Sequence, residues 1–438
     1  MLSLFKRDYI QELKDHFSDC NDIIFETIYH PETSSKERYF VLIYQENTCL
    51  DNIKSVLLEA LNNKIYHLDE TKLHGIKEIS LKNLDLIEKK IFSMEVLVYD
   101  TLTGIISSIP TFKEVKTINE VSLNIKDNTL QLRNVIRTPK LKIKSYDIGE
   151  STKTNVRLIY QEELVNEEIQ NDIHKSLKRC TLSSVMSMDD LHNIASGCNR
   201  SFLPVFGQTT NLNLIKKELD KGHFVIFMDG QEKALIGPYN LFGLLGLSLN
   251  NYPYLFIERI IKVIAIFIGL FLSGLVASLY LYHPSLMPYS LLSNINIQDN
   301  LVLNLSIQFI IIEVILLLIK LLNQFTKSYL TIIIGALSLI SLLYTNFINA
   351  DILLFSLISF ISINLLSIEK KLNEAFYIIH LIVLILSLIL GMLGFAFSVI
   401  FTIIFISSKK VFDQTYLYPL SPLDFSSLWN YLKGKIVK

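Results

Sequence analysis

Glu313 is the ionisable residue whose setting is most unusual, because it lies about midway along a long apolar stretch, residues 301–322. A carboxylate in hydrocarbon is costly unless it pairs or faces water, so acids inside membranes commonly mark ion or substrate paths. The structural alternative is a protonated or hydrogen-bonded glutamate that holds helices together. The sequence leaves both interpretations open.

A second polar feature lies in the next apolar stretch, residues 329–344. Thr331, Gly335 and Ser338 follow i, i+4, i+7 spacing, which places them on one face of a helix. Ser341 continues this stripe. Such a stripe either lets another helix pack closely or lines a narrow aqueous path. Spacing alone favours packing.

The motifs of common enzyme classes are absent from the sequence. It contains no G-x-x-x-x-G-K-[ST], G-x-G-x-x-G, H-E-x-x-H or G-x-S-x-G pattern. The nine histidines include no i, i+4 pair that would suit a metal. The four cysteines include no C-x-x-C pair. We therefore expect no enzyme activity and no resident metal or cofactor.

Charge is unevenly distributed along the 438 residues. Residues 1–258 carry 30 Lys+Arg and 35 Asp+Glu, whereas residues 259–438 carry 11 and 7. The whole chain is 50% hydrophobic and 19% charged, and soluble domains have about 25% charged residues. This difference predicts a water-soluble front half and a membrane-embedded back half. Neither half is basic enough to predict nucleic-acid binding.

The back half contains five long apolar stretches, each expected to form a membrane helix. They are residues 260–282, 301–322, 329–344, 352–368 and 376–407. The last stretch could form one long tilted helix or two short arms that meet at Gly391 and Gly394. The sequence therefore predicts an all-α polytopic membrane domain of five to six helices.

Short loops set the expected orientation of these helices. Lys and Arg lie before the first stretch and in the loops near residues 320–327 and 370–371, whereas loops 283–300 and 346–351 have none. Because Lys/Arg-rich loops stay on the cytoplasmic side, the front half should be cytoplasmic. The N-terminal residues do not resemble a signal peptide. The basic residues of 409–438 also favour the cytoplasmic side, which requires six crossings.

The front half alternates between predicted strands and helices. Apolar runs predict buried strands at residues 39–44, 94–99, 156–160 and 224–228. Amphipathic spacing predicts helices at residues 51–62, 166–177 and 212–220. This alternation predicts two α/β lobes, at residues 1–150 and 151–250. A transmembrane domain at 259–408 and a tail at 409–438 should follow.

Four sequence blocks occur in a fixed order. They comprise Gly149, Thr152, Lys153 and Thr154 in the first, Asp229 and Gly230 in the second, His283, Pro284 and Pro288 in the third, and Pro419 and Pro422 in the fourth. Together they resemble the A subunit of GerA-type spore germinant receptors, from about residue 134 to 424. Leu316 and Leu317 stand where the family has a basic and an acidic residue, so the chain resembles a divergent member.

The resemblance implies a multi-pass protein of the spore inner membrane or cell membrane. It implies partnership with a transporter-like B subunit that senses nutrients and a lipoprotein C subunit. It further implies a ring of A subunits that conducts ions when nutrient binds, with residues 331–341 along the path. Two alternatives stay open: a membrane-anchored scaffold without conduction, and a subunit of a small-solute transporter.

Overall fold

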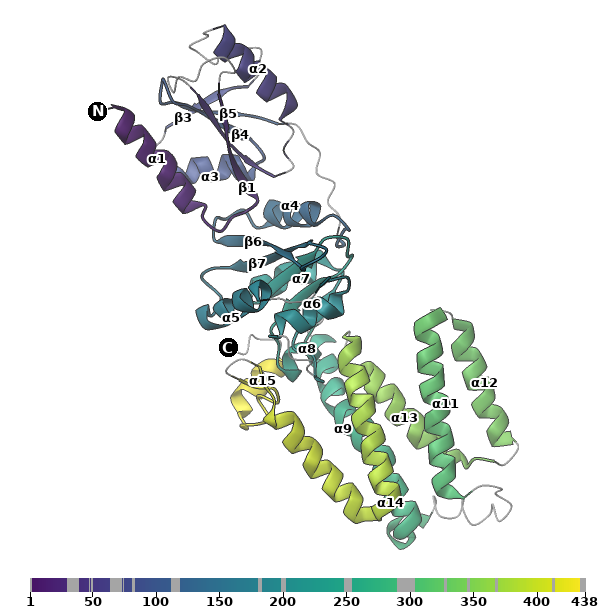
Figure 1. The fold of residues 1–438 in the computed structure, drawn as a ribbon. Coiled ribbons are helices and arrows are strands. Elements are labelled where there is room, and N and C mark those ends of the chain that lie inside the picture. The colour runs from purple at the N-terminus through teal and green to yellow at the C-terminus, as the bar shows by residue number, and fades with distance from the viewer. Residues whose placement is uncertain are drawn as a thin grey trace. The chain divides into compact units, whose positions relative to one another are not determined.

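The computed structural model describes two compact units, Met1–Arg200 with Gln208–Pro238 (unit 1) and Ser201–Gly207 with Tyr239–Lys438 (unit 2). Figure 1 shows the elements of both. The residues described are 2–433 without 30–38, 47, 49, 64–72, 74, 81–82, 112–118, 180–182, 198–201, 248–253, 290–303, 327–328, 345–346, 367–368 and 412–413.

Unit 1 begins with a five-stranded sheet of order β1-β2-β4-β5-β3. The strands are β1 (Ile23–Ile28), β2 (Phe40–Gln45), β3 (Lys77–Ile79), β4 (Val96–Asp100) and β5 (Ile106–Ile109), and all their pairings are antiparallel. Helices α1 (Leu2–His16), α2 (Asp51–Asn62) and α3 (Leu84–Phe92) belong to this lobe.

Both faces of this first sheet are covered, which explains the continuous apolar runs in its central strands. Val41 and Ile43 of β2 pack in one core with Ile87 of α3. Phe40 and Leu42, whose side chains point to the opposite face, pack in a second core with Leu57 of α2. The strands and helix expected here from the sequence are confirmed.

The second lobe of unit 1 is built on a sheet of order β6-β7-β9-β10-β8. Its strands are β6 (Leu141–Ile148), β7 (Thr154–Gln161), β8 (Gly207–Thr209), β9 (Phe224–Met228) and β10 (Ala234–Gly237). Its helices are α4 (Ile125–Val135), α5 (Glu167–Lys178), α6 (Met188–Ala195) and α7 (Leu212–Leu219). The sequence predicted β7, β9, α5 and α7 to within a few residues.

Buried ion pairs join the two lobes of unit 1. Arg133 of α4 is fully buried, and its Nε and Nη2 donate to the two carboxylate oxygens of Asp22, each at 2.8 Å. Arg157 of β7 contacts Glu46 across the same boundary at 2.6 Å. A bidentate pair without solvent fixes the angle between its partners, so the lobes behave as one unit.

In its described residues, unit 2 is helical apart from a two-stranded ribbon, β11 (Lys410–Val411) with β12 (Gln414–Thr415). Its helices are α8 (Leu241–Leu245), α9 (Tyr254–Tyr282), α11 (Leu305–Thr326), α12 (Tyr329–Tyr344), α13 (Ala350–Leu365), α14 (Lys370–Ser408) and α15 (Phe425–Leu432), with the 3-10 turn η2 (Pro284–Leu286) after α9. Within the described residues, α9, α11 and α14 are long and apolar enough to cross a membrane, and α12 and α13 are shorter apolar helices. Each apolar stretch expected from the sequence forms a helix.

The longest helix, α14, consists of two arms, residues 370–390 and 392–408. Gly391 separates them with φ of 63° and ψ of −140°, a backbone conformation that residues other than glycine rarely adopt. Such a break removes helical donors from the last carbonyls of the first arm. The hydroxyl of Tyr282 on α9 donates to two of these carbonyls, those of Leu388 at 2.9 Å and Ile389 at 3.0 Å.

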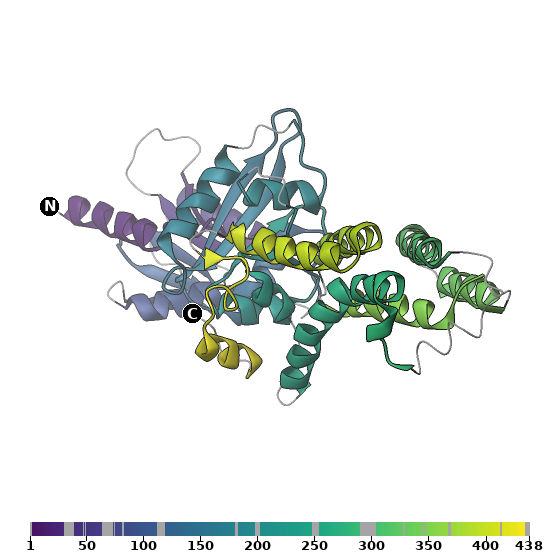
Figure 2. The same cartoon turned by 90° about the horizontal axis from the view of Figure 1, so that it is seen from below.

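Small residues let α9 approach its neighbours closely. A Cβ at Gly269 would lie 2.8 Å from Ile363 of α13, and one at Gly274 would lie 2.9 Å from Val383 of α14. The hydroxyl of Ser273 on α9 donates to that of Ser359 on α13 at 2.9 Å. Helices α11 and α12 pack beside each other, as Figures 1 and 2 show. Unit 2 therefore uses the small-residue packing typical of membrane helices.

Candidate functional site

Glu313 lies in a buried polar cluster between α11 and α14. Only 3% of Glu313 is exposed. The hydroxyl of Tyr377 donates to Glu313 Oε2 at 3.1 Å and lies 3.2 Å from the Glu313 main-chain carbonyl oxygen. His380 Nε2 lies 3.2 Å from Glu313 Oε1. Tyr377 and His380 are three residues apart on α14, so both face α11.

Aromatic rings and one lysine surround this cluster. The ring of Tyr377 stacks against His380, with centroids 5.9 Å apart, and meets the edge of Phe360 from α13 at the same distance. Lys320 Nζ lies 4.8 Å above the Tyr377 ring. The second imidazole nitrogen of His380, Nδ1, is buried and has no hydrogen-bond partner among the described residues. The Glu313 carboxylate therefore has two side-chain partners in a largely apolar setting.

Sequence reasoning found Glu313 and missed its two partners. His380 carried a usable signal, because a histidine inside a long apolar run is as unusual there as an acid. Tyr377 carried none, since tyrosine is common near the ends of membrane helices. Only the tertiary arrangement of α11 and α14 brings the three side chains together.

The small residues of α12 differ in how deeply they are buried and in what they contact. Gly335 is buried, and a Cβ there would lie 2.4 Å from the Ile319 side chain of α11. Ser338 is half-buried and Ser341 is exposed, and their hydroxyls donate to the carbonyls of Gly335 and Ser338, each at 2.7 Å. Thr331 belongs to α12, but its side chain lies outside the described residues. The stripe thus includes a close helix contact at Gly335 and hydroxyl groups that are half-buried at Ser338 and exposed at Ser341.

The block residues in unit 1 form tight turns. Gly149 has φ of 112°, and a Cβ there would lie 2.2 Å from the Thr152 carbonyl oxygen. Thr154 Oγ1 donates to the Val185 carbonyl at 3.1 Å, whereas Lys153 is exposed. These positions shape the connection between β6 and β7, and glycine is required at the first of them.

Asp229 and Gly230 form the turn between β9 and β10. Asp229 Oδ1 accepts from the Ile125 amide of α4 at 3.3 Å, and the Gly230 amide donates to the Leu123 carbonyl at 2.9 Å. Gly230 has φ of 78°. The turn therefore anchors the beginning of α4 to the second sheet.

The block residues of unit 2 lie in its connections. His283 and Pro284 terminate α9 and begin η2, and Pro288 follows that turn. Pro419 and Pro422, both after cis peptide bonds, lie between β12 and α15. All are turn positions, so these residues shape the chain path.

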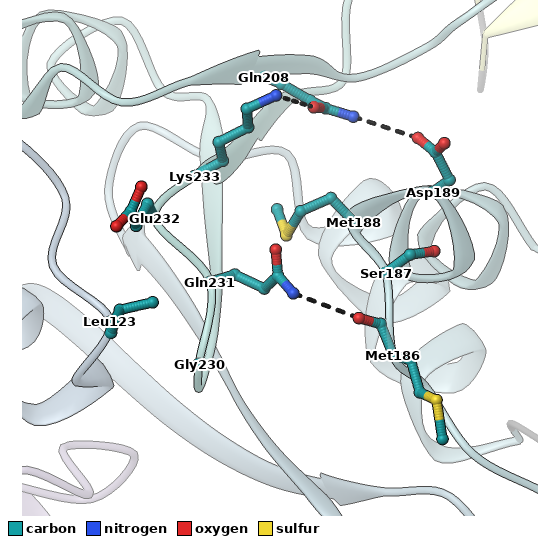
Figure 3. A pocket seen from close by; sticks show the side chains of 10 residues that line it. All are labelled: Leu123, Met186, Ser187, Met188, Asp189, Gln208, Gly230, Gln231, Glu232 and Lys233. Carbon is teal, nitrogen blue, oxygen red and sulfur yellow. Dashed lines mark hydrogen bonds between the residues drawn. The ribbon is translucent and has the colours of Figure 1, made fainter. Parts of the chain in front are cut away.

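A polar pocket of about 450 Å³ lies beside the Asp229-Gly230 turn (Figure 3). Along one side, Lys233 Nζ donates to Gln208 Oε1 at 3.5 Å, and Gln208 Nε2 donates to Asp189 Oδ1 at 3.3 Å. On the other side, Gln231 Nε2 donates to the Met186 carbonyl at 3.2 Å. Sequence reasoning did not single out these lining side chains, which come from separate elements and share no motif.

The described residues contain no group of three or more His, Cys, Asp or Glu side chains that could hold a metal ion.

Comparison with known proteins identifies the family. The family model described as Bacillus/Clostridium GerA spore germination protein matches residues 121–435, most of the chain. The chain belongs to the GerA spore germination family. The family resemblance expected from the sequence blocks is therefore confirmed.

Individual relatives are distant. The chain is 26% identical over 327 residues to spore germination protein XA of Bacillus anthracis, a match that covers 71% of this chain and 64% of XA. It is 22% identical over 315 residues to spore germination protein KA of Bacillus subtilis, covering 69% and 57% respectively. This GerA-family chain thus spans less than two thirds of the length of these relatives.

One solved structure is also similar. It is the N-terminal domain of the A subunit of the Bacillus megaterium spore germinant receptor GerK3, with 21% sequence identity and a TM-score of 0.41. The match covers 52% of this chain and 92% of the GerK3 domain.

Proposed function

We propose that this GerA-family chain is the A subunit of a nutrient-sensing germination receptor in an endospore-forming bacterium. The observation that carries the proposal is the extent of the family match, which includes the second lobe of unit 1 and every long apolar helix. A receptor needs both a part exposed to water and a membrane part, and the charge-rich lobes and long apolar helices of this chain support such a division.

The proposed activity is to form or gate an ion path as an oligomer. Two features support it: the half-buried Ser338 and the exposed Ser341 on α12, and the buried carboxylate of Glu313 on α11. In a ring of identical chains, each such residue occurs once per subunit, so small polar groups would surround a narrow aqueous path. Gly335 would set the distance between α11 and α12, and Thr331 would continue the path.

The proposed partners are a transporter-like B subunit and a lipoprotein C subunit, together with further copies of this chain. The proposed location is the spore inner membrane or the cell membrane, with unit 1 on the cytoplasmic side. The distribution of Lys and Arg between the loops supports this orientation. The uneven charge of the two halves supports a boundary near residue 259 between the soluble lobes and the transmembrane domain.

A matched pair of substitutions on α12 tests conduction. Ser338→Phe places a bulky ring on the proposed path in every subunit, whereas Ile340→Phe changes a residue that is 58% exposed on the opposite side of the helix. After nutrient addition, spores with Ser338→Phe should release potassium ions at least tenfold more slowly than wild type. Spores with Ile340→Phe should release them normally.

Wild-type ion release by the Ser338→Phe variant would contradict the proposed path along α12. If Ser338→Phe protein accumulates and assembles like wild type and releases ions at the wild-type rate, α12 does not line the path. The Gly335 contact would then be a packing seam, and a membrane-anchored scaffold would describe the chain better. Western blotting of spore membranes supplies the control for accumulation.

A further inference from the structure

An apolar cavity of about 340 Å³ lies in unit 2 between α9 and the second arm of α14. Its walls include Val263, Phe267, Leu270 and Phe271 of α9, and Ile406 of the arm. The volume falls within the range of about 300–1,000 Å³ that is typical of ligand pockets. The cavity is separate from the Glu313 cluster, which lies between α11 and the first arm.

The cavity exists because the two helices diverge from a point of contact. Near the bend, Phe271 and Phe395 meet edge to face with centroids 6.5 Å apart, and Ser278 Oγ lies 3.6 Å from Met392 Sδ. Toward residue 408 the arm leaves α9, as Figure 1 shows. The result is a tapered space between two helices.

One end of this space is bordered by α8 and by the segment before α15. Leu241 and Phe242 of α8, together with Leu417 and Leu420, complete the lining. The Leu241 amide donates to the Tyr416 carbonyl at 2.9 Å, which ties α8 to that segment. The Tyr416 hydroxyl donates to the Pro204 carbonyl, also at 2.9 Å. These bonds hold the border of the cavity in place at this end.

Polar and basic groups gather at the same end. Ser407 and Ser421 are the lining residues there that carry hydroxyls, and the exposed Lys409 and Lys410 follow directly after the arm. On α15, Lys433 Nζ lies 4.9 Å from the half-exposed Trp429 ring. Aromatic and basic side chains beside an apolar helix end are typical of the membrane–water interface.

We propose that this cavity binds one acyl chain of an anionic phospholipid, whose phosphate lies near Lys409 and Lys410. The walls match a flexible apolar chain, the taper matches its end, and the hydroxyls and lysines match the glycerol and phosphate groups. The site needs only a membrane-embedded unit 2, so it stands independently of ion conduction.

Other occupants fit the cavity less well. A helix from a second subunit is about 10–12 Å wide, and α9 and the arm already touch at Phe271 and Phe395. Water is disfavoured because the walls offer few polar partners. An empty space would leave its lining without van der Waals contacts on one side. An acyl chain is narrower than a helix, needs no polar partners and fills the space with van der Waals contacts.

Filling the cavity should expel the lipid. Ile406 is 5% exposed and lines the cavity, whereas Ile404, two residues earlier, is 61% exposed and faces away. In the full chain purified in mild detergent, Ile406→Trp or Leu420→Trp should lower the retained phospholipid per protein at least tenfold. Ile404→Trp should retain the wild-type amount. Equal retention in all variants would overturn the proposal.

The wild-type chain provides a test that does not depend on the folding of a variant. A phosphatidylglycerol with a diazirine in its acyl chain should label peptides containing Phe267 and Ile406. Unlabelled phosphatidylglycerol should compete for this labelling, and Lys409→Gln with Lys410→Gln should reduce it. As a control, Lys175→Gln, at an exposed position on α5 of unit 1, should leave it unchanged. Labelling that phosphatidylcholine displaces equally well, or labelling confined to outward-facing residues, would contradict a specific anionic lipid site.

Discussion

At the scale of single residues, the buried Glu313–Tyr377–His380 cluster is the most informative feature of unit 2. Tyr377 also reaches the main-chain carbonyl of residue 313, so removal of the carboxylate leaves it one acceptor. His380 loses its partner altogether, because its Nδ1 has none among the described residues. The imidazole is therefore the group that depends on Glu313.

This dependence predicts an order of stability for Glu313 variants. Glu313→Leu should destabilise the full chain by about 1–3 kcal/mol, the typical cost of one buried polar group without a partner. Glu313→Gln keeps an acceptor for His380 and should cost less. Thermal unfolding of the purified chain measures both, with the exposed Ile310→Leu as control. Wild-type stability in Glu313→Leu would show that the carboxylate matters for charge and not for packing.

His174 in the second lobe of unit 1 predicts a pH dependence. Burial, and then the positive charge of Lys144, lower the pKa of His174 to about 4. In the unfolded chain this pKa is about 6.5, so between pH 6.5 and 4 the unfolded state binds a proton that the folded state does not. Stability should therefore be full above pH 6.5 and fall as the pH drops toward 4. His223, whose pKa burial also lowers to about 4, acts in the same direction.

Thermal unfolding midpoints between pH 7 and pH 4 check this expectation. His174→Asn removes one titrating group and should make the midpoint fall less steeply over that window, and His174→Asn with His223→Asn should flatten it further. An unchanged slope in the double variant would assign the pH dependence to carboxylates elsewhere in unit 1.

At the scale of elements, the bend in α14 decides how many helical segments unit 2 has. A Cβ at residue 391 would lie 2.7 Å from the Tyr282 ring, and the backbone there has positive φ. Gly391→Ala should therefore cost at least about 1–2 kcal/mol, the penalty of a left-handed conformation for a residue with a side chain. The neighbouring exposed Ile389→Ala is the matched control, and unfolding midpoints give the difference.

Tyr282→Phe tests the hydrogen bonds that the Tyr282 hydroxyl makes at the bend of α14. It keeps the ring against Gly391 and removes the hydroxyl from the Leu388 and Ile389 carbonyls. Two carbonyls that lose a donor at the bend should cost about 1–3 kcal/mol. If Tyr282→Phe is as stable as wild type, solvent or lipid headgroups satisfy these carbonyls, and the bend lies at the membrane surface.

At the scale of the whole molecule, the two-arm form of α14 gives the described part of unit 2 six apolar helical segments, namely α9, α11, α12, α13 and the two arms. This number suits an orientation with both flanks on the cytoplasmic side. Cysteine labelling in intact cells tests this. In a background without the native cysteines, Gly230→Cys should resist a membrane-impermeant thiol reagent, whereas Ser285→Cys should react. Both positions are exposed on their own units. The reverse labelling would invert the topology.

The sequence by itself determined the elements that depend on local pattern. Continuous apolar runs located β2, β9 and α12, and amphipathic spacing located α2. The uneven charge separated the charge-rich lobes from the apolar helices. Each of these follows from which neighbours along the chain are apolar. The four blocks also determined the family. Gly391 was a candidate bend, but a helix can also run through glycine, so the pattern left two forms open.

Only the tertiary structure decided which distant residues meet. His380 and Tyr377 reach Glu313 because the fold brings their stretch of α14 within side-chain reach of α11. Tyr282 caps the bend because α9 lies against α14, and Arg133 reaches Asp22 because the two lobes share one boundary. Each of these pairs is separated by more than sixty residues, and no spacing rule connects them. Their partners are chosen by packing of whole elements, since a buried polar group is stable only where the fold supplies its counterpart.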